Sequence, residues 1–322
     1  MVYLVPREQF GSAYKHVELI RRELGGEIWP LWDHRYQTAL KALLGRGLPL
    51  MAIVRGDHSE HYRACIELEV PYLLLENDVA TLRQPAAGLE ELERERLENA
   101  RGVIFTSGDM AAYCAARYKL PPHEVIHLRP LRRMLGFVPR EKLGGHRMVY
   151  AGGLVSWSER GGALGYRAYY EIFRAIMRAG WQVDVFTAVP APTRELYERA
   201  GVRMLGRVPQ DHLYERLSAY SAGFLGYNRD GVPPAAFAYT QLCRPNKTWE
   251  YLAAGIPTVA YQAGNTAELI SSWGLVLEQL EQLATLNGHL PAISKAVRMA
   301  EVMDEDRPAL LELLEAAGAL EL

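Results

Sequence analysis

The sequence contains little cysteine and no long apolar run. Its three cysteines, Cys65, Cys114 and Cys243, have none of the paired spacings of a disulfide framework or a zinc site. No stretch of 18 apolar residues occurs, so the sequence predicts no membrane-spanning helix. The opening MVYLVPREQF lacks the basic region and long apolar segment of a secretory signal. These absences predict a cytoplasmic protein with reduced thiols.

The sequence also lacks an excess of charge of one sign. Its 36 basic and 38 acidic side chains give a net charge of −2, so there is no global field to hold a polyanion and a nucleic-acid-coating role is not implied. Lysine is scarce, with six copies against 30 arginines, a bias that indicates no particular function. At 322 residues the chain is long enough for two domains.

Short apolar segments alternate with helical patterns along the first part of the chain. The expected strands are 2–5, 48–54, 70–76, 102–107 and 124–128, and the expected helices are 8–24, 58–69 and 88–99. Continuous apolar strands separated by helices are typical of a parallel sheet covered on both faces.

The basic segment RPLRRMLGFVPREKLGGHR (129–147) interrupts this pattern. We interpret it as a connector whose arginines pair with the acidic helix that follows residue 88. Attraction of an anionic partner is the alternative.

A second alternation follows the connector. The expected strands are 147–153, 181–188, 202–208, 222–227 and 256–261, with helices at 164–179, 210–220 and after Pro245.

The predicted fold class is therefore α/β, with two Rossmann-like parallel-sheet domains at 1–145 and 146–280. Amphipathic helices fill 281–322, where they cap the second domain, form an interface or cross back to the first.

Ligands of open parallel sheets bind at the carboxyl ends of the strands. Gly152 and Gly153 fall there in AGGLVSWSERGG, where a glycine pair lets the backbone approach a ligand closely, and Arg160 follows in the same segment. The segment is neither a Walker sequence nor a dinucleotide fingerprint.

Two opposite charges stand in the otherwise apolar stretch RPNKTWEYLAAGIPTVAYQAGNTAELI (244–270). Lys247 falls at the start of a short helix, where a cation can bind phosphate together with the helix dipole. Glu250, one turn later, can accept hydrogen bonds from two sugar hydroxyls. A local ion pair worth a few tenths of a kcal/mol is the alternative, and spacing alone does not separate the two.

In order, YAGGL, VRMLGRVPQDHLYERLSAYSAGFLGY and the 244–270 stretch resemble the donor-binding half of GT-B glycosyltransferases, particularly the large retaining family that includes sucrose and mannosyl transferases. The resemblance covers about residues 147–275. It implies a nucleotide-diphosphate sugar, such as a UDP- or GDP-sugar, on the second domain and an acceptor on the first. It implies no metal and no further cofactor. The only Asp-x-Asp, Asp304 to Asp306, lies in the C-terminal tail, where we expect a solvated helix end.

The resemblance also implies roles for single residues. Glu250 matches the acidic residue that binds ribose, and Lys247 and Arg160 match positions that meet the diphosphate. The remaining matched positions are Gly206, Arg207 and Val208 at the base, and Asn265, Thr266 and Glu268 near the ribose or sugar. Leu242 stands where the family usually has a glutamate that contacts the donor sugar, which leaves the sugar and the stereochemical outcome open.

Polar residues of the first domain are candidates for the acceptor side. Asp57, His58 and Asp78 follow expected strands. If the reaction inverts the anomeric configuration of the sugar, one of them is the catalytic base. If the configuration is retained, they orient the acceptor hydroxyl. Asp57 as a helix N-cap and a metal site with His61 are alternatives. In the second domain, Trp157 and Trp249 either stack on a ligand or pack in the core.

The sequence thus predicts a glycosyltransferase. The alternatives are a nucleotide-sugar epimerase of the same fold and a non-catalytic nucleotide- or sugar-binding protein. The acceptor is unidentified, with glycan, lipid-linked, small-molecule, protein and nucleic-acid acceptors all open, as is peripheral association with a membrane.

Overall fold

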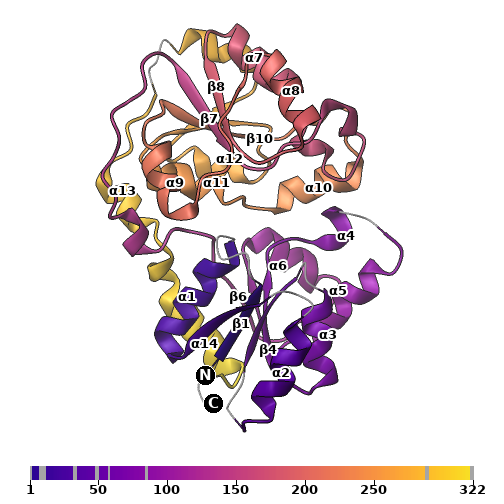
Figure 1. Cartoon of the computed structure of the whole chain (residues 1–322). Helices are drawn as coiled ribbons and strands as arrows, with labels where there is room; N and C mark the ends of the chain where they lie inside the picture. Colours follow the sequence, from indigo (N-terminus) through magenta and orange to yellow (C-terminus); the bar gives the residue numbers. More distant parts are fainter. Residues whose placement is uncertain are drawn as a thin grey trace. The chain divides into compact units, whose positions relative to one another are not determined.

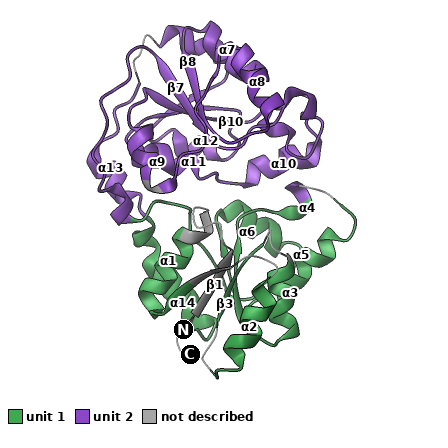
Figure 2. Cartoon of the chain, in the orientation of Figure 1, with its two compact units in different colours: residues 1–81, 85–131, 303–322 green, residues 82–84, 132–302 purple. Residues whose placement is uncertain are grey.

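The computed structural model describes residues 2–6, 12–31, 35–47, 51–56, 59–83, 86–286 and 290–319. The chain forms two compact units (Figure 2). Unit 1 comprises residues 1–81, 85–131 and 303–322, and unit 2 comprises residues 82–84 and 132–302. Both are built on parallel sheets flanked by helices, so the predicted fold class is confirmed (Figure 1).

Unit 1 alternates strands and helices along the chain. In order, its elements are β1 (Val2–Pro6), α1 (Ser12–Leu24), β2 (Glu27–Leu31), α2 (Tyr36–Leu44), β3 (Ala52–Arg55), α3 (Ser59–Glu67), β4 (Tyr72–Glu76), α4 (Ala80–Arg83), α5 (Leu89–Glu98), β5 (Gly102–Phe105), α6 (Gly108–Ala115) and β6 (His123–Val125). Strands β3, β4, β5 and β6 form one parallel sheet in that order, and β1 pairs in parallel with β2. Every residue of β4 and β5 is buried, which explains their continuous apolar sequences.

The end of the chain returns to unit 1. The amide of Met303 donates to the carbonyl of Pro130 at 2.9 Å, and α14 (Arg307–Ala316) then packs against β5, β6 and α1. A Cβ at Gly102 of β5 would lie 3.1 Å from Leu313, so this glycine makes room for the helix. Unit 1 is therefore assembled from both ends of the sequence.

Unit 2 is a six-stranded parallel sheet with helices on its faces. Its elements are β7 (Arg147–Ala151), α7 (Tyr170–Arg178), β8 (Gln182–Phe186), α8 (Ala191–Arg199), β9 (Arg203–Met204), α9 (Gln210–Leu217), β10 (Ala222–Gly226), α10 (Pro234–Leu242), α11 (Lys247–Ala254), β11 (Thr258–Tyr261), α12 (Thr266–Ile270), β12 (Leu275–Leu277) and α13 (Lys295–Ala300). Short 3-10 turns occupy Arg132–Leu135, Trp157–Glu159, Gly165–Arg167, Leu280–Thr285 and, in unit 1, Met303–Asp306. Gly255, at a φ of 73°, ends α11 in the left-handed conformation that glycine favours.

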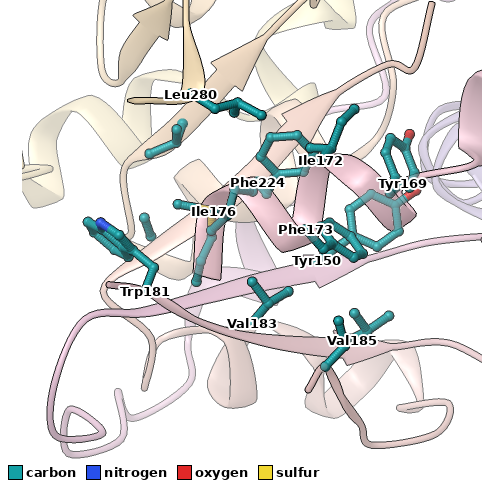
Figure 3. Close-up of a cluster of buried hydrophobic side chains, with 14 of the residues drawn as sticks. Tyr150, Tyr169, Ile172, Phe173, Ile176, Trp181, Val183, Val185, Phe224 and Leu280 are labelled. Carbon is teal, nitrogen blue, oxygen red and sulfur yellow. The ribbon is translucent and has the colours of Figure 1, made fainter. Parts of the chain in front are cut away.

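An aromatic cluster fixes α7 on the sheet. Ile172, Phe173 and Ile176 of α7 lie among Tyr150, Val183 and Val185 of the strands beneath (Figure 3). The Tyr150 ring lies 4.8 Å from that of Tyr169 and 5.7 Å from that of Phe173, both at inclined angles that aromatic pairs favour. Tyr150 thus has its ring in the core while it stands one residue before the end of β7.

More than half of the residues in the basic 129–147 segment are exposed, as expected of a connector, but four of its apolar side chains pack against unit 2, which the sequence did not predict. Met134, Leu135, Phe137 and Leu143 rest on the core cluster of unit 2 that includes Tyr214 and Tyr251. Its apolar side chains could not be distinguished by periodicity from those of a loop, because the segment has no regular strand or long helix.

Three arginines of this segment pair with residues other than those we expected. Arg140 bonds Glu215 at 2.8 Å, Arg147 bonds Asp184 at 3.4 Å, and Arg129 bonds Asp306 at 3.5 Å. None of these partners belongs to the acidic helix α5.

In the ranges that the structure describes, no helix has both the length and the apolar character needed to cross a membrane.

Candidate functional site

The strand order of unit 2 reverses between two of its strands. The sheet runs β9-β8-β7-β10-β11-β12, which in chain order reads 3-2-1-4-5-6. In doubly wound sheets of this order the ligand crevice lies outside the carboxyl ends of the strands at the reversal, here between β7 and β10. The residues that follow these two strands, and the helices that begin at the same edge, are therefore the candidates.

Tyr251 of α11 holds β7 and β10 together at the reversal. The ladder between the two strands pairs Met148 with Ala222 and Val149 with Gly223. Beyond these pairs the Tyr251 hydroxyl accepts a hydrogen bond from the Ala151 amide and donates to the Phe224 carbonyl, each at 3.1 Å. This bridge fixes α11, and with it Lys247 and Glu250, on the sheet.

Lys247 lies at the glycine turn after β7. A Cβ at Gly152 would stand 3.2 Å from Lys247 Nζ and 3.1 Å from the Tyr150 hydroxyl. The ammonium lies 4.8 Å from the centre of the Tyr150 ring and donates to its hydroxyl at 3.5 Å. The Tyr150 hydroxyl in turn donates to the Gly153 carbonyl at 2.9 Å. The glycine thus leaves backbone and ammonium side by side.

Glu250 is buried, and its partner comes from another helix. Gln210, the first residue of α9, donates from Nε2 to Glu250 Oε1 at 3.3 Å. Helices α9 and α11 pack together, and both begin at the carboxyl edge of the sheet (Figure 1). Lys247 and Glu250, which the structure describes, do not form an ion pair with each other. The alternative of a local Lys247–Glu250 ion pair is therefore wrong.

Arg160 is engaged by its own loop. Its Nη1 donates to the carbonyl of Trp157 at 3.1 Å, and its guanidinium lies 5.1 Å from the centre of the Trp157 ring. Its aliphatic part rests on Gly231, in the loop after β10. Trp157 is half-buried beside it, whereas Trp249 is buried in the core 5.7 Å from the Trp273 ring.

A second arginine, Arg167, reaches the same glycine turn, and the sequence analysis did not identify it. A Cβ at Gly153 would lie 2.9 Å from Arg167 Nη1. The chain reverses between the two because residues 161–165 form a tight turn, in which a Cβ at Gly165 would overlap the backbone of Arg160. The glycines in GGALG (161–165) were the available signal for this reversal.

The loop before α9 carries the three residues expected to contact the base. Gly206 has a φ of 76°, which favours glycine, and Arg207 is exposed. Val208 packs against the core cluster beneath α9.

The loop after β11 carries the other expected residues. Asn265 and Glu268 are exposed. Thr266 is fully buried, and its hydroxyl donates to the carbonyl of Cys243 at 3.2 Å. That bond ties the loop to the segment that leads into α11.

Of the residues expected on the acceptor side, Asp57 and His58 lie outside the described residues. Asp78 is half-buried after β4. Its neighbour Glu76 is fully buried, bonds Arg96 through both oxygens at 2.7 and 3.1 Å, and has a pKa raised by burial to about 7. Arg96 also bonds Glu93 at 3.1 Å.

Carboxylates of the C-terminal tail are paired with arginines of unit 1. Asp304 bonds Arg22 at 2.7 Å, and Asp306 bonds Arg129. Among the residues that the structure describes, no three histidine, cysteine or carboxylate side chains gather as a metal site would need.

Comparison with known proteins yields similarity of structure alone. No protein-family model matches the chain, and no curated protein matches it. Anabaena Alr3699/HepE, solved with UDP and glucose, superposes with a TM-score of 0.61 at 10% identity, covering 99% of this chain and 96% of that one. Sucrose-phosphate synthase from Thermosynechococcus elongatus gives 0.57 at 17% identity, covering 89% and 75%. A putative UDP-N-acetylglucosamine 2-epimerase from Listeria monocytogenes gives 0.57 at 9% identity, covering 100% and 96%.

These similarities establish the fold. The structural neighbours include GT-B glycosyltransferases, as the resemblance in the sequence implied, and the fold is shared with an epimerase. At such low identities a shared fold does not establish a shared activity, so the function has to be argued from the site.

Proposed function

We propose that this chain is a glycosyltransferase that binds a nucleotide-diphosphate sugar at the carboxyl edge of the unit 2 sheet. The observation that carries the proposal is the placement of Lys247 and Glu250 at the reversal point. A cation beside a glycine turn suits a diphosphate, and a buried carboxylate one helical turn away suits the two hydroxyls of a ribose. UDP- and GDP-sugars are the donors to test first.

Glu250 is suited to accept from a ribose because one of its oxygens is held by Gln210. An ionised carboxylate only accepts hydrogen bonds, so its second oxygen suits a ligand with hydroxyl donors. Lys247 is suited to the phosphates because, among the described residues, its ammonium bonds only the Tyr150 hydroxyl, at the long distance of 3.5 Å.

We also propose that the departing diphosphate is stabilised without a metal, by Lys247 and by the helix N-termini at this edge of the sheet. Positioned cations and helix N-termini can stabilise developing negative charge in a site that excludes water. A chelator is therefore expected to leave the rate of nucleoside-diphosphate release unchanged. Loss of that release on chelation, with recovery on adding Mg²⁺ or Mn²⁺, would contradict this part of the proposal.

A thermal-shift comparison tests the donor site. UDP-, GDP-, ADP- and dTDP-sugars are added to the wild type, to Glu250→Gln and to Glu195→Gln, an exposed glutamate of α8 that serves as the control. A ligand specific for the native state adds about 2.7 kcal/mol at 100 times its Kd. We expect one nucleotide class to stabilise the wild type and the control while Glu250→Gln loses the response. An equal response of all three proteins would refute the site.

The products formed from the stabilising donor separate the remaining alternatives. A transferase releases nucleoside diphosphate by transfer or slow hydrolysis, whereas an epimerase returns an isomerised nucleotide sugar without acceptor. A binding protein does neither. Release of nucleoside diphosphate that rises when an acceptor is added supports the proposal, and epimerisation or unchanged donor refutes transfer.

A further inference from the structure

Two arginines are candidates for the second cation at the Gly152–Gly153 turn, and their surroundings differ. Arg160 lies in the segment that resembles known transferases, but its guanidinium is held by the carbonyl and ring of Trp157. Arg167 stands seven residues later, at the end of a 3-10 turn, with its Nη1 against Gly153.

The Arg167 guanidinium is surrounded by tyrosines. It lies 5.4 Å from the centre of the Tyr166 ring, and Tyr150, Tyr169 and Tyr239 are also close to it. Within the described ranges no carboxylate pairs with it, and no protein oxygen accepts from its guanidinium. A half-buried cation without a counter-charge is costly, so the site favours an anionic ligand.

Arg167 and Lys247 flank successive residues of one turn. Lys247 Nζ lies beside Gly152 and Arg167 Nη1 beside Gly153, and consecutive Cα atoms are about 3.8 Å apart. Tyr150 connects the two cations, because its hydroxyl accepts from Lys247 and donates to the Gly153 carbonyl. An anion resting on this turn therefore meets a cation on each side.

We propose that Arg167, rather than Arg160, is the arginine that holds the diphosphate together with Lys247 at the Gly152–Gly153 turn. This inference rests on the proposed function and names the second cation of its site. The guanidinium offers a planar set of donors that matches phosphate oxygens, while the ammonium acts as a point charge. Arg160 instead bonds the carbonyl of Trp157 and lies against Gly231.

The tyrosines around Arg167 help to fix its position, a support that a pair of surface cations would lack. Tyr239 belongs to α10, and its ring lies 5.8 Å from that of Tyr166, which carries Arg167 on its face. The Asn228 side chain joins the same turn to the loop after β10 by donating to the Gly165 carbonyl at 3.3 Å. The position of Arg167 is thus fixed by elements on both sides of the strand reversal, as a preorganised phosphate site requires.

Calorimetric titration of matched variants tests the assignment. The proteins are the wild type, Arg167→Gln and Arg160→Gln, and the probes are UDP, GDP, their nucleoside monophosphates and inorganic pyrophosphate. We expect Arg167→Gln to weaken the better nucleoside diphosphate roughly 10- to 100-fold and the monophosphate less, and Arg160→Gln to stay within about threefold of the wild type. Arg167→Lys keeps the positive charge but lacks the planar set of guanidinium donors, so it should lose an intermediate amount of affinity for the nucleoside diphosphate.

Three outcomes distinguish the inference from the proposed function. If nucleoside diphosphates bind and Arg160→Gln rather than Arg167→Gln loses them, the assignment of Arg167 is wrong and the donor site stands. If only pyrophosphate binds and Arg167→Gln abolishes it, the cation pair is an anion site and the donor proposal is wrong. If none of the probes binds the wild type, both are wrong. Melting temperatures and circular dichroism of the variants verify that each is folded, and Arg167→Lys replaces Arg167→Gln if the latter is not.

Discussion

The ring of Tyr251 lies directly on the backbone of Gly223. A Cβ added to this glycine of β10 would overlap Cγ, Cδ1 and Cδ2 of the tyrosine. The close approach lets the Tyr251 hydroxyl reach past β10 to bridge the Ala151 amide and the Phe224 carbonyl. One glycine and one tyrosine thereby set where α11 meets the sheet.

Gly223→Ala is expected to destabilise unit 2 by about 3 kcal/mol, because the ring cannot retreat from a packed core without moving α11. Urea unfolding measures the change. Gly136→Ala is the control, since a Cβ there would meet only the Arg133 carbonyl at an ordinary 3.6 Å. A Gly223→Ala protein as stable as this control would mean that the Tyr251 ring is free to shift.

Tyr251→Phe keeps the ring and removes the bridge. The Ala151 amide is left buried without its acceptor, so we expect a loss of about 1–3 kcal/mol in the free energy of unfolding. Tyr170→Phe is the comparison, because Tyr170 is partly buried beside the same core. Equal stabilities of the two variants would show that the bridge contributes nothing.

His16 is expected to make unit 1 sensitive to acid. Burial lowers its pKa from 6.5 to about 4, while Nε2 bonds the Ile126 carbonyl at 2.9 Å. The unfolded chain therefore binds the proton more tightly than the folded one. The contribution of His16 to the free energy of unfolding is full above pH 6.5 and falls as the pH drops towards 4, by at most about 3 kcal/mol. His16→Gln, which can keep the bond to Ile126, should flatten the stability profile in this window. A slope unchanged by the substitution would contradict the prediction.

Glu76 is expected to act in the opposite direction. Its pKa rises from 4.5 to about 7, chiefly through burial, although Arg96 opposes the rise, and Glu93 and Asp78 add to it. The folded protein therefore holds the proton more tightly, and the contribution of Glu76 to stability is full below pH 4.5 and lost as pH rises through 7. Relative to wild type, Glu76→Gln should be more stable at pH 8 than at pH 5, as chemical denaturation at the two values would reveal. The reverse order would mean that the pairing with Arg96 dominates burial.

Much of the fold could be predicted because parallel strands buried on both faces have continuous apolar sequences. β4 and β5 are of this kind, and so are β7 and β10. β2 was missed because it contains Glu27 and Pro30, which interrupt such a run. β12 was missed because it has only three residues and lies at the edge of the sheet. These two segments form strands because they pair with neighbouring strands, and that pairing cannot be predicted from the local sequence alone.

The site divides in the same way. Lys247 and Glu250 could be singled out because they lie in one short helix with few other charges. Arg167 could not, because its approach to Gly153 depends on a chain reversal fourteen residues long. The contact of Gln210 with Glu250 joins residues 40 apart and is set by the packing of α9 on α11. Periodicity identifies elements, but it does not specify which side chains of different elements meet.

The return of α14 to unit 1 has a consequence for the order of events during translation. The sheet of unit 1 is synthesised before residues 132–302, whereas Leu310, Leu313 and Leu314, which are buried in α14, are synthesised after them. Residues 132–302, which make up all of unit 2 except residues 82–84, are synthesised in between. The surface at Gly102 of the earlier-made sheet therefore stays uncovered until the segment that follows unit 2 has been synthesised.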